Sequence, residues 1–103
     1  MNCQQKIINL MTICRKAGKL IIGFDAAKNA VSDGSACCIL ISEDISDNTL
    51  KKIMNISGSI PVIKTGMKCS EAELYFNRKA AVAAVCDKGF ARRFGELASQ
   101  IKG

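Results

Sequence analysis

Hydrophobic and polar positions along the chain follow two alternating periods. Some segments repeat apolar residues at the i, i+3, i+4, i+7 spacing of a helix face, as Ile7, Leu10, Met11 and Cys14 do. Others are short apolar runs bounded by glycine, serine or proline, which is typical of strands buried in a sheet. The expected helices span 6–17, 24–32, 47–56, 70–76 and 90–101, and the expected strands span 20–22, 37–41, 60–63 and 80–86. This alternation predicts an α/β fold, a three-layer α/β/α sandwich with a four-stranded mixed sheet, in a single domain covering 1–103.

Local signals place several element ends. Ser46 is expected to cap the third helix, and Ser70 with Glu73 three residues later resembles a capping box for the fourth. Asn77 is expected to end that fourth helix in a left-handed conformation. Pro61, at the start of the third strand, suits an edge position because proline cannot donate a ladder hydrogen bond.

Composition narrows the chemistry that the chain can perform. The 103 residues carry a formal charge of +6, six cysteines and no histidine. Without histidine there is no Ser–His or Cys–His pair and no recognisable zinc ligand set, so we expect no metal and no cofactor. Most of the cysteines lie in apolar runs, and we expect reduced thiols in the cytoplasm. No apolar run has the length of a membrane helix and no secretory signal is visible, so we expect no membrane association.

An enzymatic interpretation rests on little. Glu43 and Asp44 follow a predicted buried strand, where catalytic or metal-binding carboxylates often lie. We favour a solvated turn that helps to cap the following helix, because no partner residues converge on them. We therefore expect no enzyme activity, with a small-molecule-binding or hydrolytic domain around this pair as one alternative.

Basic residues near two loops point toward nucleic acid. A positive domain favours polyanions through counterion release, although a charge of this size also serves solubility. Gly23 would let a ligand approach the backbone at the start of a helix, where Lys28 could contact phosphate and Asn29 a base edge. The residues grouped around the two loops are Arg15, Lys16, Lys19, Gly23, Lys28 and Asn29 for the first, and Arg78 and Lys79 for the second. We interpret Lys51, Lys52, Lys88, Arg92 and Arg93 as ordinary solvent-facing cations.

The order of several short motifs resembles the kink-turn-binding ribosomal protein superfamily, and within it the short bacterial branch. These motifs are RKAGKLIIG at 15–23, ILISED at 39–44, IPV at 60–62, AAVAAV at 80–85 and DKGFA at 87–91. The resemblance implies a non-catalytic α/β/α protein that binds structured RNA, a kink-turn-like or ribosomal RNA, as a ribosomal or ribosome-associated protein of translation. It implies that one region meets the sheared G·A pairs of the bend and that the loop before the last strand contacts a flipped-out nucleotide. Carried over here, the first region is Gly23, Phe24, Asp25, Ala26 and Asn29 with Lys28 beside them, and the second is Asn77, Arg78, Lys79 and Ala80.

The chain departs from the family's Gly-x-Asn-Glu-x-x-Lys signature. Asp25 stands at the Asn position, Ala26 at the Glu position and Asn29 at the Lys position. Asp25 is unfavourable near phosphates and Ala26 cannot hydrogen-bond to a guanine edge, so a weaker kink-turn affinity or another structured RNA are both open. A second alternative is a protein-interaction or regulatory adaptor that uses the surface bearing Phe24. We expect the chain to be a monomer.

Overall fold

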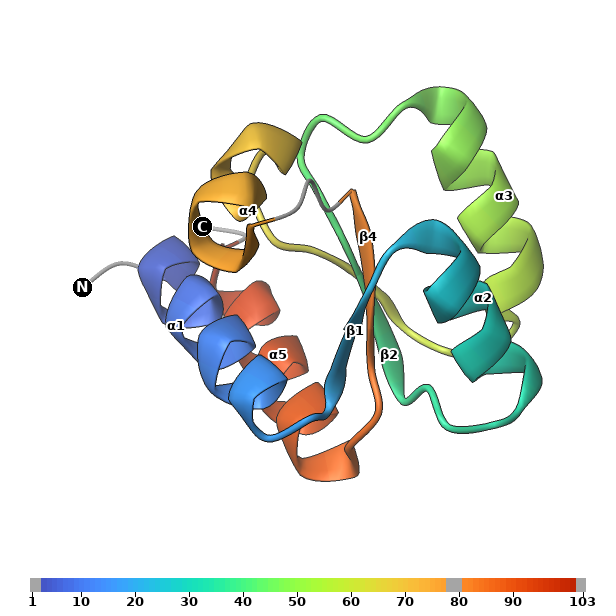
Figure 1. Ribbon diagram of the computed structural model, residues 1–103, viewed down its shortest axis with the longest axis horizontal. Helices are drawn as coiled ribbons and strands as arrows, with labels where there is room; N and C mark the ends of the chain where they lie inside the picture. The colour runs from blue at the N-terminus through green and yellow to red at the C-terminus, as the bar shows by residue number, and fades with distance from the viewer. Residues whose placement is uncertain (1–2, 78–80, 102–103) are drawn as a thin grey trace.

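Helices and strands alternate throughout the computed structural model, which describes residues 3–77 and 81–101 (Figure 1). The elements are α1 (Cys3–Lys16), β1 (Leu20–Ile22), α2 (Phe24–Ser32), β2 (Cys38–Ile41), α3 (Asp47–Ser57), β3 (Val62–Lys64), α4 (Cys69–Phe76), β4 (Val82–Val85) and α5 (Lys88–Ile101). Each element was expected at this place in the chain, and the predicted α/β class is confirmed. β1 matches its expected range, whereas β2 and β4 are shorter than the apolar runs 37–41 and 80–86, and β3 begins two residues later than expected.

The four strands form one mixed sheet in the order β1-β4-β2-β3. The last strand inserts between the first two and is antiparallel to both, with Ile22 opposite Ala83 and Ile41 opposite Val82. β3 lies parallel to β2 on the outside. Pro61 directly precedes this edge strand, so its predicted edge position is confirmed.

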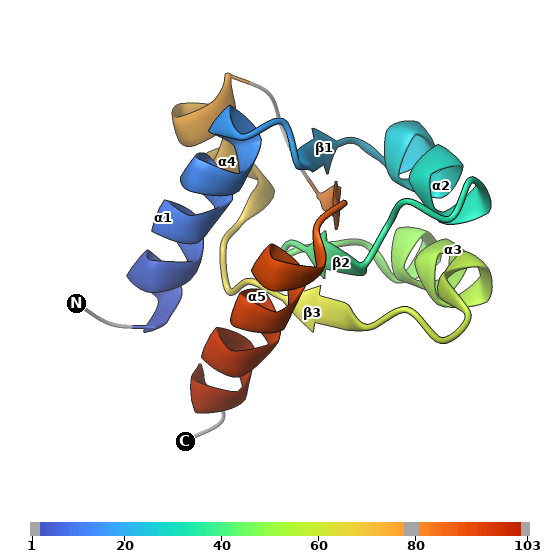
Figure 2. The same cartoon turned by 90° about the horizontal axis from the view of Figure 1, so that it is seen from below.

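The sheet is buried on both faces, which makes the molecule three-layered (Figure 2). Alternate residues of β2 point to opposite sides: Leu40 joins the core under α1, α4 and α5, while Ile39 joins the core under α2 and α3. On the first side the core centres on Phe94 and Phe76, which are fully buried. The continuous apolar strands noticed in the sequence therefore reflect burial from two directions.

The ends of the helices confirm some of the predicted caps and correct one. The hydroxyl of Ser46 accepts a hydrogen bond from the Thr49 amide at 3.2 Å, as expected of the cap of α3. Asn77 ends α4 in the left-handed region at φ 58°. The Ser70–Glu73 capping box is wrong, because α4 begins at Cys69 and the Glu71 carboxylate accepts from the Lys68 amide instead. The helix therefore begins one residue before the expected start at 70.

The thiols of Cys14 and Cys38 are packed as core side chains. Burial raises the pKa of Cys14 to about 11 and that of Cys38 to about 12, so both remain protonated near neutral pH. Along the described part of the chain, no helix has the length and apolar character needed to cross a bilayer.

Candidate nucleic-acid interface

The sheet topology places Gly23, from the first predicted RNA-binding region, beside the strand that follows the second region. The carboxyl ends of β1, β2 and β3 lie at the same end of the sheet as the start of β4. There the Gly23 amide donates a hydrogen bond of 2.9 Å to the Val82 carbonyl, and the Ser42 amide donates one of 2.9 Å to Ala81. We call this end of the sheet the Gly23 edge. Gly23, from the first predicted region, thus touches the strand that follows the second.

Gly23 takes a backbone conformation that other residues rarely adopt. Its φ of 116° and ψ of 151° lie in a region that an L side chain disfavours, and it holds the position before the first residue of α2. Its carbonyl accepts from the Ala27 amide and so begins the helix ladder. Because glycine has no capping side chain, the first amides of α2 are not capped by this residue and face the edge.

The outer face of α2 carries the polar residues predicted for contact. The helix packs on the sheet through Ala27 and Ala30, which are buried, so that Asp25, Lys28 and Asn29 are exposed. Because alanine side chains are small, the helix lies close to the sheet at these two positions. The outer stripe is polar but carries both signs of charge.

Phe24 does not present an exposed ring at this surface. Its side chain is partly buried and packs against the core between the sheet and the α2/α3 layer. The adaptor hypothesis depended on an exposed Phe24, and the structure places most of its apolar surface in contact with the protein instead.

The second predicted region is described only at its two flanks. Asn77 is exposed and its amide donates to the Glu73 carbonyl, while Arg78, Lys79 and Ala80 lie outside the described residues. The preceding turn is held from α1: the Arg15 guanidinium donates a 2.7 Å hydrogen bond to the Phe76 carbonyl and lies 5.4 Å from the Phe76 ring centroid. Arg15 therefore positions the end of α4, from which this region departs.

Lys19 lies at the other end of the sheet from Gly23. It precedes β1, and its carbonyl accepts a 2.8 Å hydrogen bond from the Cys86 amide, just beyond the end of β4. The expected grouping of Lys19 with Gly23 around one loop is not observed, because the two residues flank opposite ends of one short strand. Proximity in sequence suggested a shared loop, and strand direction separates them.

Glu43 and Asp44 lie at the Gly23 edge, where Asp44 has a structural task. Its Oδ1 accepts a 2.9 Å hydrogen bond from the Cys69 amide, 25 residues away, and so caps α4. This hydrogen bond lowers the pKa of the Asp44 carboxyl. The expected role in capping the following helix is corrected: Ser46 caps α3, and Asp44 caps α4. In the described ranges no three Cys, Asp or Glu side chains are arranged to hold a metal ion.

Two exposed apolar side chains lie at the end of α4, beside the last turn of α1, and were not predicted as site residues. Leu74 is 83% exposed and Tyr75 is 49% exposed, both in the last turn of α4 before Asn77. A shallow hollow lined by Tyr75 and Phe76 from α4 and by Arg15 from α1 lies beside them. An exposed aromatic beside an arginine offers a stacking surface for a base. In the sequence, Leu74 and Tyr75 fall between the buried Ala72 and Phe76, which are spaced four residues apart on the inner face of the helix.

The described part of the Gly23 edge has a mixed charge. Lys28 and Lys68 are exposed there, but so are the carboxylates of Asp25, Glu43 and Asp44. A ligand at this edge would therefore meet backbone amides and single cations rather than a uniformly positive field. Such an arrangement suits recognition of particular groups more than nonspecific phosphate attraction.

Comparisons with known proteins agree with the predicted fold and identify the family. The chain is 31% identical to the RNA-binding protein YlxQ of Enterococcus faecium over 91% of its own length and 92% of that protein. A protein with unknown function from Bacillus halodurans superposes with a TM-score of 0.82 at 27% identity, over 91% of this chain and 97% of that one. The 15.5kD RNA binding protein of Giardia lamblia gives a TM-score of 0.74 at 13% identity, over 97% and 88%, which is a likeness of fold. No protein-family model matches.

The chain belongs to the YlxQ family.

Proposed function

We propose that this protein binds structured RNA at the Gly23 edge, without catalysis, as a ribosomal or ribosome-associated factor in the cytoplasm. The single observation that carries the proposal is the 2.9 Å hydrogen bond from the Gly23 amide to the Val82 carbonyl. It joins the start of α2 to the strand behind the second predicted loop, so one RNA bend can contact both. The membership of the YlxQ family, whose Enterococcus faecium member is named as RNA-binding, supports the same partner.

The groups at this edge divide into three kinds of RNA contact. The amides at the start of α2 can bind a phosphate or a base-edge acceptor, and Lys28 can bind phosphate. Asn29 offers an amide that can pair with a base edge. Tyr75 can stack on an unpaired base beside Arg15. The sequence adds Arg78 and Lys79 to this set.

The substitutions in the first turn of α2 set the expected RNA preference. Asp25 is exposed next to the uncapped amides and competes with an incoming phosphate, and Ala26 provides no acceptor for a guanine edge. We therefore propose that a standard kink-turn binds more weakly here than to proteins with the complete signature. The natural RNA should then place a group other than a phosphate beside the Asp25 carboxylate.

A binding panel tests the proposal. The protein is titrated at low salt into a fluorescently labelled kink-turn hairpin, a straight duplex of equal length and ribosomal RNA fragments. The proposal predicts saturable binding to the bent or ribosomal RNA that is tighter than binding to the straight duplex. Absence of binding to all three, or equal affinity for all three, contradicts it. Lys28→Gln should weaken the specific complex, whereas Lys51→Gln, which removes the same charge from α3, should not.

A further inference from the structure

A second group of cations lies at the end of the sheet opposite the Gly23 edge. It contains Lys16 from the end of α1, Lys19 from the turn before β1, and three residues from the first two turns of α5. In Figure 1 the α1–β1 turn and the β4–α5 turn lie together at the lower end of the molecule. We call this group the α5 basic surface, and all five side chains are exposed: Lys16, Lys19, Lys88, Arg92 and Arg93.

Main-chain contacts hold these cations close to one another. The Cys86 amide donates to the Lys19 carbonyl at 2.8 Å, and Lys88 follows only two residues later. The last part of α1 lies near the β4–α5 turn. The Asp87 carboxylate in that turn is close enough to the Cys14 thiol to contribute, after burial, to its raised pKa. Residues that looked scattered in the sequence are therefore gathered by the return of β4 beside β1.

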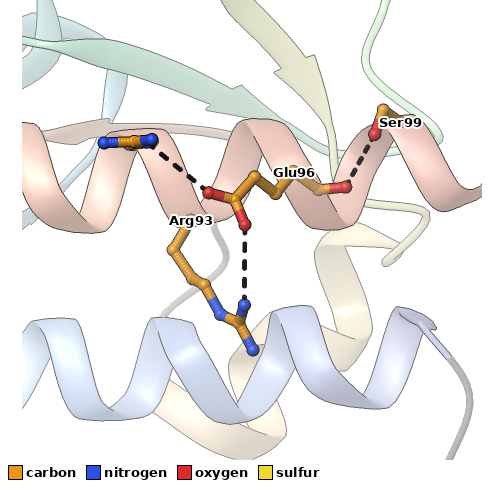
Figure 3. A network of polar contacts seen from close by, with 4 residues as sticks. Arg93, Glu96 and Ser99 are labelled. Carbon is orange, nitrogen blue, oxygen red and sulfur yellow. Dashed lines mark hydrogen bonds and ion pairs between the residues drawn. The ribbon is translucent and has the colours of Figure 1, made fainter.

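The carboxylates nearby do not neutralise the surface. Glu96 lies 3.7 Å from Arg92 and 3.7 Å from Arg93, so one acid serves two arginines, and all three side chains are more than half exposed. Figure 3 shows Arg93 reaching from α5 toward α1 below Glu96. The Asp87 carboxylate is engaged as the cap of α5, accepting from the Phe90 amide at 3.0 Å. Within the described ranges, no ion pair includes Lys16, Lys19 or Lys88.

The position of Lys88 is unfavourable for the isolated protein. It is the first residue of α5, where the helix dipole disfavours a cation, and no acidic residue stands in that first turn. The local sequence thus concentrates positive charge where folding alone gives no benefit. An anionic ligand would reverse the sign of this electrostatic contribution.

We propose that the α5 basic surface is a second contact for the phosphate backbone of the RNA bound at the Gly23 edge, an inference that rests on the proposed function. Two aromatic rings border the surface: Phe90, which is partly buried beside Arg93, and Tyr75, which lines a hollow with Lys16. The five exposed cations outnumber these rings and suit phosphates, whereas a protein partner usually requires an apolar centre inside a polar rim. The molecule measures 35 Å along its longest axis. The two ends of the sheet are separated only by the length of strands of 3 to 4 residues, so a helix that flanks the bend can reach the α5 basic surface.

The test compares two RNAs and two matched variants. Both RNAs derive from the RNA that binds best in the panel. One keeps only a few base pairs on each side of the bend, and the other has one helix longer than the 35 Å axis of the protein. The variant Lys19→Gln/Lys88→Gln removes two charges from the α5 basic surface. The control Lys51→Gln/Lys52→Gln removes two charges from the exposed side of α3. All four side chains are exposed, and thermal melts check that both variants fold.

We expect the Lys19→Gln/Lys88→Gln variant to bind the long RNA about tenfold more weakly, with a salt slope smaller by about 1.5, and to bind the trimmed RNA as the wild type does. The control should match the wild type on both. Unchanged binding of the long RNA, equal loss in the control, or equal loss on the trimmed RNA overturns the second contact. Failure of the wild type to bind any RNA of the panel overturns the proposed function itself. Binding to anionic lipid vesicles is measured as well. If the lysine substitutions weaken vesicle binding but leave RNA binding unchanged, the surface belongs to a membrane contact and the inference is overturned.

Discussion

The guanidinium of Arg15 donates a 2.7 Å hydrogen bond to the carbonyl of Phe76 and lies 5.4 Å from the centroid of its ring. The two residues are 61 positions apart, so the contact ties the last turn of α1 to the last turn of α4. Phe76 itself is fully buried under the sheet. Arg15 thus satisfies a carbonyl at the end of a helix, where cations are favoured, and fixes the point at which the chain leaves α4.

Replacing Arg15 should cost stability as well as RNA affinity. Loss of one hydrogen bond and one cation–π contact predicts that Arg15→Ala lowers the free energy of unfolding by about 1–2 kcal/mol. Urea denaturation measures this change. Arg15→Lys keeps the charge but loses the planar geometry, so it should recover salt-dependent RNA attraction more than stability. A variant as stable as the wild type would show that the contact does not hold α4.

Gly23 should tolerate no side chain. At φ 116° an added Cβ is strained, and we expect Gly23→Ala to lower the free energy of unfolding by about 1–3 kcal/mol and Gly23→Val by at least as much. The same change should weaken RNA binding more than its effect on folding explains, because it also obstructs approach to the α2 amides. Gly95→Ala is the control, since an added Cβ there meets no atom within 4 Å and a helical alanine is favoured. Equal RNA affinity of Gly23→Ala and wild type, both folded, would contradict this account of the edge.

Restoring the family signature in α2 should strengthen kink-turn binding. The variant Asp25→Asn/Ala26→Glu/Asn29→Lys removes a carboxylate from the first turn, adds an acceptor for a guanine edge and adds a cation. We expect the dissociation constant for a kink-turn hairpin to fall by about tenfold or more, which is the size of one good base contact. Asp25→Asn alone separates the charge effect from the base contact. An unchanged or higher dissociation constant in the triple variant would mean that α2 does not face the bend.

Asp44 should make the stability depend on pH in the acid range. Its folded pKa is lowered by the hydrogen bond from the Cys69 amide, so its contribution is complete above the unfolded pKa, about 3.9, and is lost as pH falls through the folded value. Asp44→Asn should therefore be less stable than wild type at neutral pH, and the difference should vanish in strong acid. Denaturation at a series of pH values measures it. Glu43→Gln is the control, because the Glu43 side chain makes no hydrogen bond with the described residues; a matching acid dependence in that variant would show that Asp44 is not the source.

Much of the fold can be predicted from sequence because local chemistry decides it. Three features depend only on residues that are close in sequence: the cap of α3 by the Ser46 hydroxyl, the left-handed end of α4 at Asn77, and the buried strand that ends at Ile41. The alanines of α2 likewise indicate a helix that lies close to a sheet. In these cases short-range geometry and burial point to the same structure.

The arrangement of the candidate site could not be predicted in the same way. Whether Lys19 or Val82 lies beside Gly23 depends on the insertion of β4 between β1 and β2, which no local pattern encodes. Asp44 caps α4 from 25 residues away, so a local pattern does not reveal that this helix begins at Cys69. The gathering of Lys19 with Lys88 has the same origin. The differences between the predicted and the observed binding surface therefore come from the order of the strands in the sheet.

The central claim is that RNA binds at the Gly23 edge, and amide chemical-shift mapping tests it most directly. The 15N-labelled protein is titrated with the RNA that binds best in the panel, at a salt concentration that suppresses nonspecific contact. The account predicts the largest shifts at the amides of Gly23 to Asn29, of Asn77 and of Ala81, with α3 unaffected. Saturable binding whose shifts are confined to α3 or the β3 edge, leaving Gly23 and Ala81 unmoved, would contradict it.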